Sequence, residues 1–309
     1  MVDKKVYIAG HRGMVGSAIV RRLERGGYRS LITRTRQELD LLDQKAVHDF
    51  LVEEKPDYIF MAAAKVGGIV ANDTYRADFI YENLQVQNNV IHGAMMAGIK
   101  NMCFFGSSCI YPRDCAQPIK EEYLLSGPLE KTNEPYAIAK IAGLKLCENM
   151  NRQYGARIVC VMPTNLYGPN DNYDLENSHV MPALIRKAHE AKIRGDAEYV
   201  VWGTGQPRRE FLYVDDLADA CVFLMERQVG DGILNVGYGD DITIRELAQT
   251  VMDVVGFTGR ILFDSSKPDG TPRKLLDVSK MAGLGWQAKT SLHEGIADTY
   301  ASYLNSFQD

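Results

Sequence analysis

The sequence predicts an α/β protein with a doubly wound parallel sheet and a smaller mixed α/β lobe. In the first half of the chain, short apolar, β-rich runs alternate with longer helical patterns, as in successive strand–helix–strand units. A glycine-rich loop directly follows the first run and opens the first helix. Beyond Pro163 the strict alternation breaks down, and glycine, proline and asparagine cluster in residues 163–177. We therefore expect a sheet domain over residues 1–165 and mainly a lobe over residues 166–309.

The individual elements follow from periodicity and from helix start signals. Strands are expected at 6–9, 30–33, 58–62, 102–105 and 158–162. Helices are expected at 14–26, 44–53, 78–97 and 136–154, and the capping-type segment 132–135 precedes the last of them. In the lobe, helical patterns cover 180–193, 215–226 and 244–255, and turn-rich segments lie at 203–207 and 267–272. The run 233–236 is expected to return to the main sheet as a late strand.

The composition is that of a folded globular protein, with 46% hydrophobic and 24% charged residues among 309. A formal net charge of −5 argues against a general nucleic-acid binder or a polybasic membrane binder. The sequence shows no signal-peptide pattern and no apolar run long enough to span a bilayer, so we expect a cytoplasmic protein. Its six cysteines show neither Cys-x-x-Cys pairs nor zinc-ligand spacing, so no metal is expected.

The glycine loop has the pattern Gly-x-x-Gly-x-x-Gly. Glycines allow a tight turn and close backbone approach, so that a pyrophosphate can lie on the unpaired amides at the start of a helix. A plain strand-to-helix turn is the alternative, but the position of the loop between the first strand and first helix favours a dinucleotide. The predicted contacts are Gly10, His11, Arg12, Gly13, Met14, Val15 and Gly16.

The end of the second expected strand indicates which dinucleotide binds. NAD-binding proteins place an acidic residue there, which accepts the ribose hydroxyls. This chain has Thr33-Arg34-Thr35-Arg36 instead, with no carboxylate until Glu38. Guanidinium groups suit the 2′-phosphate of NADP, which a carboxylate would repel. Arg36, together with Arg12, therefore favours NADP, although solvated surface arginines are the alternative.

Tyr136 and Lys140 are four residues apart and share one face of the expected helix. An adjacent ammonium group favours the phenolate, so that the tyrosine can exchange protons as an acid or base. The spacing alone is common on helix surfaces. Ser107, however, ends the fourth expected strand at the carboxyl edge of the sheet, where open α/β folds bind ligands. We expect it beside Tyr136, where it can bind a substrate carbonyl oxygen.

Together these motifs resemble the extended short-chain dehydrogenases/reductases that act on nucleotide sugars and share the Rossmann fold. Within this family, the chain is most similar to enzymes that epimerise C3 and C5 of a GDP-linked 4-keto-6-deoxy sugar and then reduce C4 with NADPH. The resemblance covers nearly the whole chain. Its motifs are 10–16, 62–69, 106–112, 133–136, 162–169, 209–216 and 267–274.

The resemblance implies roles for two further residues, with Cys109 as the base and His179 as the acid of the epimerisation. Cys109 lies two residues after Ser107, where an electropositive site would favour its thiolate. A packed structural cysteine is the alternative. His179 precedes an expected helix, and imidazole transfers protons near neutral pH, although a histidine near a helix start needs no such role.

The resemblance also implies binding residues. For the cofactor it adds Ala63, Pro163, Asn165 and Leu166, besides Lys140 and His179. For the nucleotide diphosphate of the substrate it implies Lys187, Trp202, Arg209 and Asp269. The family usually has an arginine where Lys187 stands, so charge is retained but bidentate geometry is not. Packing within a strand is the alternative for Trp202. The family also implies a homodimer formed by the helices 78–97 and 136–154.

Other activities remain open from the residues. A reductase or an NAD-retaining 4-epimerase needs Ser107, Tyr136 and Lys140 but not the pair Cys109 and His179. A non-catalytic NADP-sensing protein would keep the fold and tolerate loss of Tyr136. A 4,6-dehydratase is disfavoured, because that chemistry usually has an Asp-Glu pair where this chain has Cys109-Ile110.

Overall fold

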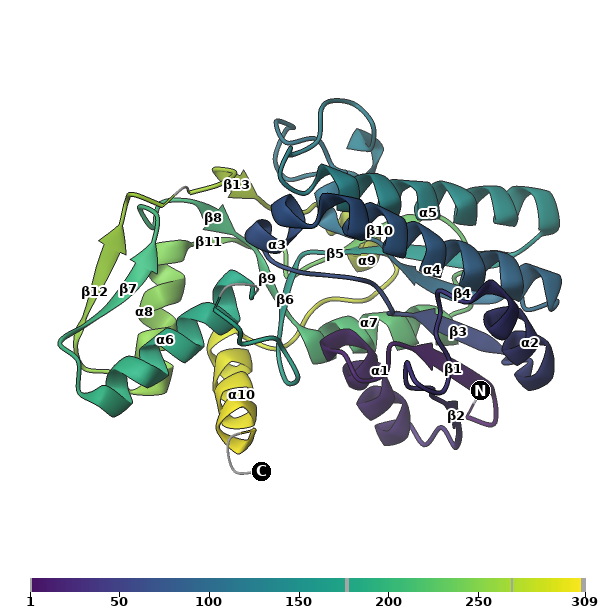
Figure 1. Cartoon of the computed structure of the whole chain (residues 1–309), viewed down its shortest axis with the longest axis horizontal. Helices are drawn as coiled ribbons and strands as arrows, with labels where there is room; N and C mark the ends of the chain where they lie inside the picture. Colours follow the sequence, from purple (N-terminus) through teal and green to yellow (C-terminus); the bar gives the residue numbers. More distant parts are fainter. Residues whose placement is uncertain (1, 176–177, 268, 307–309) are drawn as a thin grey trace.

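The computed structural model describes residues 2–175, 178–267 and 269–306. Asn177 and Pro268, which belong to two of the sequence segments considered above, lie outside the described residues. The main sheet has six parallel strands in the order β10-β5-β4-β3-β1-β2, which confirms the predicted fold class (Figure 1). The strands are β1 (Lys5–Ala9), β2 (Ser30–Ile32), β3 (Tyr58–Met61), β4 (Asn101–Phe105), β5 (Arg157–Pro163) and β10 (Ile233–Val236).

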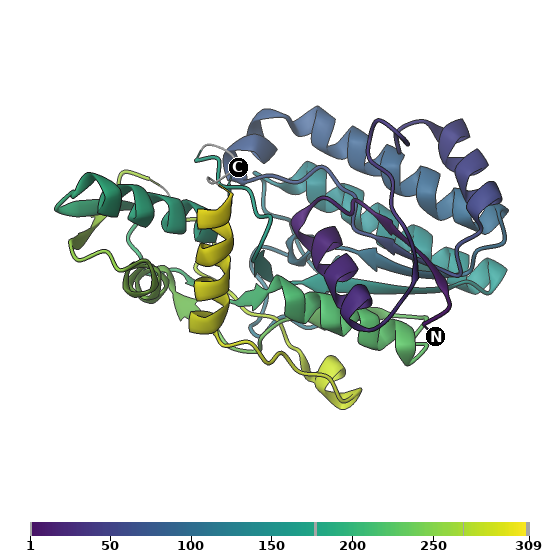
Figure 2. The same ribbon diagram turned by 90° about the horizontal axis from the view of Figure 1, so that it is seen from below.

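Helices cover both faces of this sheet (Figures 1 and 2). On one face lie α2 (Gln44–Glu54), α4 (Arg76–Met96) and α5 (Glu134–Tyr154), whose apolar side chains form one core with the sheet. On the other lie α1 (Met14–Arg25), α7 (Val214–Glu226) and the short α9 (Ser279–Gly283), around a second core. Burial on both faces explains why the central strands are almost continuously apolar.

The order of the strands places the ligand-binding edge. The chain leaves β1 toward β2 on one side and continues through β3 on the other, so the topology reverses between β1 and β3. Ligands of open α/β sheets bind at the carboxyl ends of the strands beside this switch point. The loops after β1, β3, β4 and β5 are therefore expected to surround the site.

The smaller lobe has its own core and several short sheets. Its helices are α6 (Val180–Arg194), α8 (Ile244–Val255) and α10 (Leu292–Asn305). Its strands pair as β7 (Glu198–Trp202) with β12 (Arg260–Asp264), and as β8 (Arg208–Arg209) with β11 (Ile242–Thr243) and β13 (Arg273–Lys274). The strand β6 (Asn165–Tyr167) pairs with β9 (Phe211–Tyr213), between the lobe and the main sheet (Figure 1).

Besides α9, two segments after residue 165 belong to the main sheet domain. The strand β10 pairs in parallel with β5, as expected for 233–236. The helix 215–226 was expected in the lobe, and that placement is wrong, because α7 packs on the sheet beside α1. Asp215 of α7 forms ion pairs with Arg21 and Arg25 of α1, at 2.5 and 2.9 Å. The amphipathic pattern predicted the helix but not which core its apolar face contacts.

The helix α5 begins two residues earlier than expected, at Glu134, with Pro135 in its first turn. Proline suits this position because the first amides of a helix have no partner within the helix. The helix expected at 78–97 also begins two residues earlier, as α4 at Arg76, and the short α3 (Ile69–Thr74) that precedes it was not predicted. These differences do not move Tyr136 or Lys140 from the face that contacts the sheet.

Candidate active site

The glycine loop after β1 is shaped by close backbone contacts. Gly10 has a φ of +82°, and a side chain at Gly16 would collide with the carbonyl oxygen of Gly10. The amide of Gly13 donates to that same carbonyl at 3.1 Å. Within the described chain no side chain caps α1, and its first turn, which begins at Met14 and Val15, has no acidic residue. The amides at this helix start are therefore suited to an anionic group such as a pyrophosphate.

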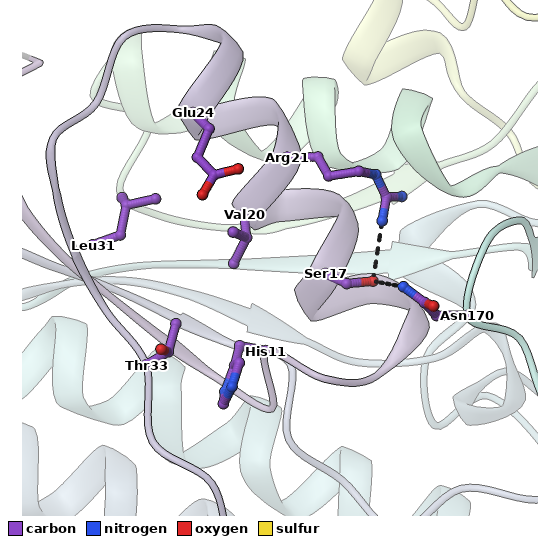
Figure 3. A pocket seen from close by; sticks show the side chains of 8 residues that line it. All are labelled: His11, Ser17, Val20, Arg21, Glu24, Leu31, Thr33 and Asn170. Atoms are coloured by element: carbon purple, nitrogen blue, oxygen red, sulfur yellow. Dashed lines mark hydrogen bonds between the residues drawn. The ribbon is translucent and has the colours of Figure 1, made fainter. Parts of the chain in front are cut away.

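A groove of about 500 Å³ lies beside this loop, between α1 and β2 (Figure 3). Ser17 accepts hydrogen bonds from Arg21 and from Asn170, at 3.3 and 3.0 Å, and so ties the chain after β6 to α1. His11 and Thr33 lie near each other in the groove (Figure 3), and the Nδ1 atom of His11 is buried without a hydrogen-bond partner among the described residues. The groove therefore adds polar groups to the region around the glycine loop.

The arginines near β2 differ in their surroundings. Arg34 is held by Glu54 at 2.6 Å and lies 5.3 Å from the ring centroid of Phe50. Arg36 is largely exposed, with its Nε 3.9 Å from Asp40. Arg12 is also exposed. Hydrogen bonds from Thr35 lower the pKa of the Glu38 carboxyl, and the charges of Arg34 and Arg12 lower it further.

Because Arg12 belongs to the glycine loop and its charge affects Glu38, this carboxyl lies within electrostatic range of the loop. Arg12 in the glycine loop and Arg36 after β2 are exposed cations, whereas Arg34 is held in place by Glu54. The two arginines predicted from the sequence to contact a 2′-phosphate are thus the two that remain accessible.

Ser107, Tyr136 and Lys140 come together at the carboxyl end of β4. Ser107 lies close enough to Tyr136 to lower the pKa of its phenol, and the Nζ of Lys140 donates to the carbonyl of Phe105 at 2.9 Å. This Nζ lies 5.8 Å from the centroid of the Tyr136 ring. Lys140 is only 3% exposed, and burial lowers its pKa to about 8.

The pKa of Tyr136 differs from the expectation that an adjacent ammonium group favours the phenolate. Burial raises this pKa and the nearby Cys109 raises it further, whereas Ser107 only partly offsets them. Burial dominates because a phenolate loses more hydration than a phenol does. In the protein alone, Tyr136 is thus a protonated donor at neutral pH.

Cys109 lies in the short 3-10 turn Ser108–Ile110 (η1), and Ser107 accepts the hydrogen bond of its backbone amide at 3.2 Å. Two side chains donate to its sulfur: the Nδ2 of Asn133 at 3.3 Å and the Nζ of Lys274 at 3.7 Å. Both contacts are hydrogen-bond donors, and that of Lys274 also brings a positive charge to the sulfur. The expected electropositive surroundings of Cys109 are therefore present, and they come from the lobe strand β13.

His179 immediately precedes α6 and is an exposed residue. The protein around the ring lowers its pKa through loss of hydration, and the charge of Lys274 lowers it further. Lys274 is thus within electrostatic range of both His179 and Cys109. The side chain of Lys274 therefore influences both residues predicted to move protons, although they are far apart in the chain.

The other predicted cofactor contacts lie around the same edge. Ala63 follows β3, and its backbone lies against Gly10. Pro163 is the last residue of β5, and Leu166 packs against the second core. Asn165 donates to the backbone carbonyl of Glu210 at 2.8 Å, which connects β6 to the lobe.

The four predicted substrate residues gather at one part of the lobe. The Nζ of Lys187 lies 4.5 Å from the centroid of the Trp202 ring, and that of Lys267 lies 5.3 Å from it. Trp202 is 50% exposed, so its ring is not simply part of a packed strand. Asp269 accepts two hydrogen bonds from Thr204, each of 2.7 Å.

Arg209 lies next to this group. Its Nη1 donates to the carbonyl of Arg208 at 2.8 Å. Burial lowers its pKa, whereas the charge of Asp269 raises it. Cationic and aromatic groups are therefore concentrated here, as binding of an anionic nucleotide requires.

Sequence reasoning did not single out Lys274 or Asn133, which both contact Cys109. Each lies within a motif of the family resemblance, at 267–274 and 133–136, but no spacing connects them to residue 109. It also overlooked Glu210, a fully buried carboxylate that accepts from the amides of Gly239 and Leu276. The charged residues next to it, Arg208 and Arg209, gave no sign that this glutamate is buried.

Within the part of the chain that the structure describes, no cluster of three or more His, Cys, Asp or Glu residues is arranged to bind a metal ion. Nor does any described helix combine the length and apolar character required to cross a membrane.

The doubly wound sheet, the glycine loop and the Ser107–Tyr136–Lys140 arrangement define the class of short-chain dehydrogenases/reductases. The chain belongs to the NAD dependent epimerase/dehydratase family, whose model matches residues 6–237. The family resemblance inferred from the motifs is thereby confirmed.

Individual relatives are similar along nearly their whole length. The chain is 58% identical to GDP-L-fucose synthase 1 of Arabidopsis thaliana, covering 99% of this chain and 95% of that protein. It is 56% identical to the GDP-L-fucose synthase of Escherichia coli strain K12, covering 99% and 98%. Among solved structures it is similar to MlghC, a GDP-mannoheptose C4 reductase from Campylobacter jejuni with NADP bound. That match has a TM-score of 0.90 and 41% identity, and covers 98% of this chain and 99% of the other.

Proposed function

We propose that the chain is a bifunctional enzyme that converts GDP-4-keto-6-deoxy-D-mannose to GDP-L-fucose by 3,5-epimerisation followed by NADPH-dependent reduction at C4. The observation that carries this proposal is the position of Cys109, whose sulfur receives hydrogen bonds from Asn133 and Lys274 next to Ser107 and Tyr136. A reductase needs only Ser107, Tyr136 and Lys140. The relatives named GDP-L-fucose synthase support the same reaction.

The residues around the glycine loop fit NADPH. Gly10 and Gly16 allow the backbone to approach a pyrophosphate, and the open amides at the start of α1 can bind it. Arg12 and Arg36 are the exposed cations that would hold a 2′-phosphate. When bound, NADPH supplies the hydride that reduces C4. Lys140, His179 and the segment from Pro163 to Leu166 complete the proposed cofactor site.

Ser107, Tyr136 and Lys140 form what we call the reduction centre. Ser107 and Tyr136 lie close together and can both donate to the C4 carbonyl oxygen of the substrate. Because burial raises the pKa of Tyr136, its phenol is protonated at neutral pH and can give its proton to that oxygen during reduction. Lys140 lies beneath the ring and keeps a cation near the phenolate that is formed.

Cys109, His179 and Lys274 form what we call the proton-transfer centre. The C4 ketone acidifies the hydrogens on C3 and C5. One base can therefore remove a proton from either carbon, while the negative charge moves to the carbonyl oxygen. Cys109 is the base, and the ammonium group of Lys274 contacts its sulfur at 3.7 Å. His179 returns the proton from the other side, and the Ser107 and Tyr136 hydroxyls stabilise the enolate oxygen as an oxyanion hole does.

The nucleotide part of the substrate is bound by the lobe in this proposal. Arg209 and Lys187 contact the diphosphate, and Trp202 flanks the base. The ammonium groups of Lys187 and Lys267 both lie near the Trp202 ring. Asp269 is held by Thr204 and is placed to accept hydrogen bonds from the nucleoside. Lys187 acts as a point charge rather than as a bidentate donor.

A 4-keto reductase without epimerase activity is the second candidate. The similarity to MlghC, a C4 reductase, favours it, because that protein has nearly the same length and fold. The two candidates differ in one measurable property. Only an epimerase exchanges the hydrogens on C3 and C5 with solvent.

The test is incubation of GDP-4-keto-6-deoxy-D-mannose with the enzyme in deuterium oxide while NADPH is withheld, followed by mass spectrometry and proton NMR. We expect more deuterium at C3 and C5 with the enzyme than in the same sugar incubated without enzyme, which measures spontaneous exchange. Absence of enzyme-dependent deuterium at both carbons would rule out the epimerase and leave the reductase. A dTDP-linked 4-keto sugar, measured in parallel, shows whether the guanine nucleotide is required.

We further propose that the enzyme is a cytoplasmic homodimer formed by α4 and α5. Exposed apolar side chains on these helices support the interface, among them Tyr81 at 64% and Ile138 at 42% exposure. Light scattering of the purified protein tests the dimer, and Tyr81→Lys with Ile138→Glu is expected to shift it toward the monomer. Cell fractionation tests the location.

A further inference from the structure

Asn133 lies at the position that precedes α5, where asparagine usually caps the helix with its side chain. Its backbone carbonyl accepts the amide of Ala137 at 3.0 Å, as a capping residue does. Its side chain, however, makes no capping hydrogen bond within the described chain. The Nδ2 atom instead donates to the sulfur of Cys109 at 3.3 Å. The side chain is thus used for the active site rather than for the helix.

The other atom of the amide group has no such contact. The Oδ1 of Asn133 is buried, and no donor among the described residues bonds to it. A buried acceptor without a donor costs free energy, so such a group in a folded protein calls for an explanation. Because the Nδ2 atom is held by Cys109, the amide cannot simply rotate to give Oδ1 another partner without losing that contact.

The surroundings of Asn133 indicate what the missing donor is. Tyr136 lies one turn further along α5, and Cys109 and Lys274 lie beside the amide. In the proposed reaction a hexose ring lies against these groups. The carbons next to its ketone are within reach of the sulfur, and the ring carries hydroxyl groups that can donate.

We propose that Asn133 bridges the base and the sugar: Nδ2 positions the sulfur of Cys109, and Oδ1 accepts a hydrogen bond from a hydroxyl group of the keto sugar. This inference rests on the proposed function. Asn133 then has two roles, each carried by one atom of its amide group: Nδ2 positions the base, and Oδ1 binds the substrate. The two roles can be separated by Asn133→Asp, because a carboxylate keeps the acceptor oxygen but has no N–H donor.

The experiment compares Asn133→Ala and Asn133→Asp with wild type and with Asn149→Ala, an exposed asparagine of the same helix. Two steady-state reactions are measured with the GDP-linked 4-keto sugar: deuterium exchange without NADPH, and reduction of the already epimerised ketone with NADPH. Loss of one neutral hydrogen bond changes binding by about tenfold or less. We expect Asn133→Ala to raise the KM for exchange about fivefold and to lower its kcat at least about tenfold.

Asn133→Asp is expected to bring KM back to within about twofold of wild type while kcat for exchange stays low, because its carboxylate cannot donate a hydrogen bond to the sulfur of Cys109. The kcat for reduction should stay within about threefold of wild type in both variants, and Asn149→Ala should resemble wild type throughout. Equal losses of exchange and reduction would overturn the proposal and indicate a structural role at the start of α5. An unchanged kcat for exchange in Asn133→Ala, or a KM in Asn133→Asp no lower than in Asn133→Ala, would overturn it as well. If wild type itself shows no exchange, the proposed epimerase fails instead.

Discussion

The reduction centre and the proton-transfer centre lie side by side but are assembled differently. Ser107, Tyr136 and Lys140 come from β4 and α5, which pack together in the main sheet domain, and Lys140 is almost fully buried. Cys109, His179 and Lys274 come from three segments, and Lys274 is 165 residues from Cys109 in the sequence. The first centre needs one strand and one helix, whereas the second forms only when the lobe lies against the sheet domain. Reduction should therefore tolerate changes in the lobe better than epimerisation does.

The largest effect is expected at the reduction centre. Tyr136→Phe removes the phenol that protonates the C4 oxygen, so kcat for NADPH oxidation should fall about 10²- to 10⁴-fold. The rate is read from the absorbance of NADPH with the epimerised ketone as substrate. Tyr154→Phe, at the end of the same helix, is the control and should have wild-type activity. Retained activity in Tyr136→Phe would point to a different proton donor or to a non-catalytic protein.

Cys109→Ser tests whether the two centres are separate. Serine keeps the size of the side chain but is a far weaker base, so deuterium exchange at C3 and C5 should fall about 100-fold. Reduction of the epimerised ketone should remain within about threefold. Cys115→Ser, a partly buried cysteine in the same connection, is the matched control. A parallel loss of exchange and reduction would mean that the separation drawn above is wrong.

Lys274→Met tests the contribution of the lobe to the proton-transfer centre. Removing the cation 3.7 Å from the sulfur should lower the exchange rate about tenfold, with a smaller loss in Lys274→Arg. The charge of Lys274 lowers the pKa of His179, so the pKa of this histidine should rise in Lys274→Met. NMR titration of the histidine ring protons measures it, with His179→Asn used for assignment. A pKa of His179 that does not move would show that the two side chains are not electrostatically coupled.

The last prediction concerns stability rather than rate. The pKa of Lys140 is about 8 in the folded chain and about 10.5 as its ordinary value, so between these pH values the unfolded chain binds more protons. The free energy of unfolding of wild type should therefore rise with pH over this range, by about 3 kcal/mol at most. Lys140→Met lacks this contribution. Urea unfolding at pH 7.5 and at pH 10 should show the advantage of the variant shrinking as pH rises, and an unchanged difference would contradict the lowered pKa.

Much of the reduction centre was predictable, because its signals are local. The Tyr136–Lys140 spacing, the serine at the end of β4 and the glycine loop after β1 each lie within a few residues of one element. The strand and helix bounds were close for the same reason. The proton-transfer centre was found only through the family resemblance, and Lys274 and Asn133 were not assigned any role. Their contacts with Cys109 join segments whose relative position no periodicity indicates.

The sequence by itself determined the parallel sheet, its glycine loop and the residues available for chemistry, because these depend on side-chain periodicity and on the backbone freedom of glycine. Only the tertiary structure decided that α7 packs on the sheet beside α1, that Glu210 is buried, and that burial keeps the phenol of Tyr136 protonated despite the nearby Lys140. It also decided that a lobe lysine and the amide of Asn133 meet at the sulfur of Cys109. The physical reason is that hydration and charge at a site depend on everything packed around it, and most of those neighbours are distant in the chain.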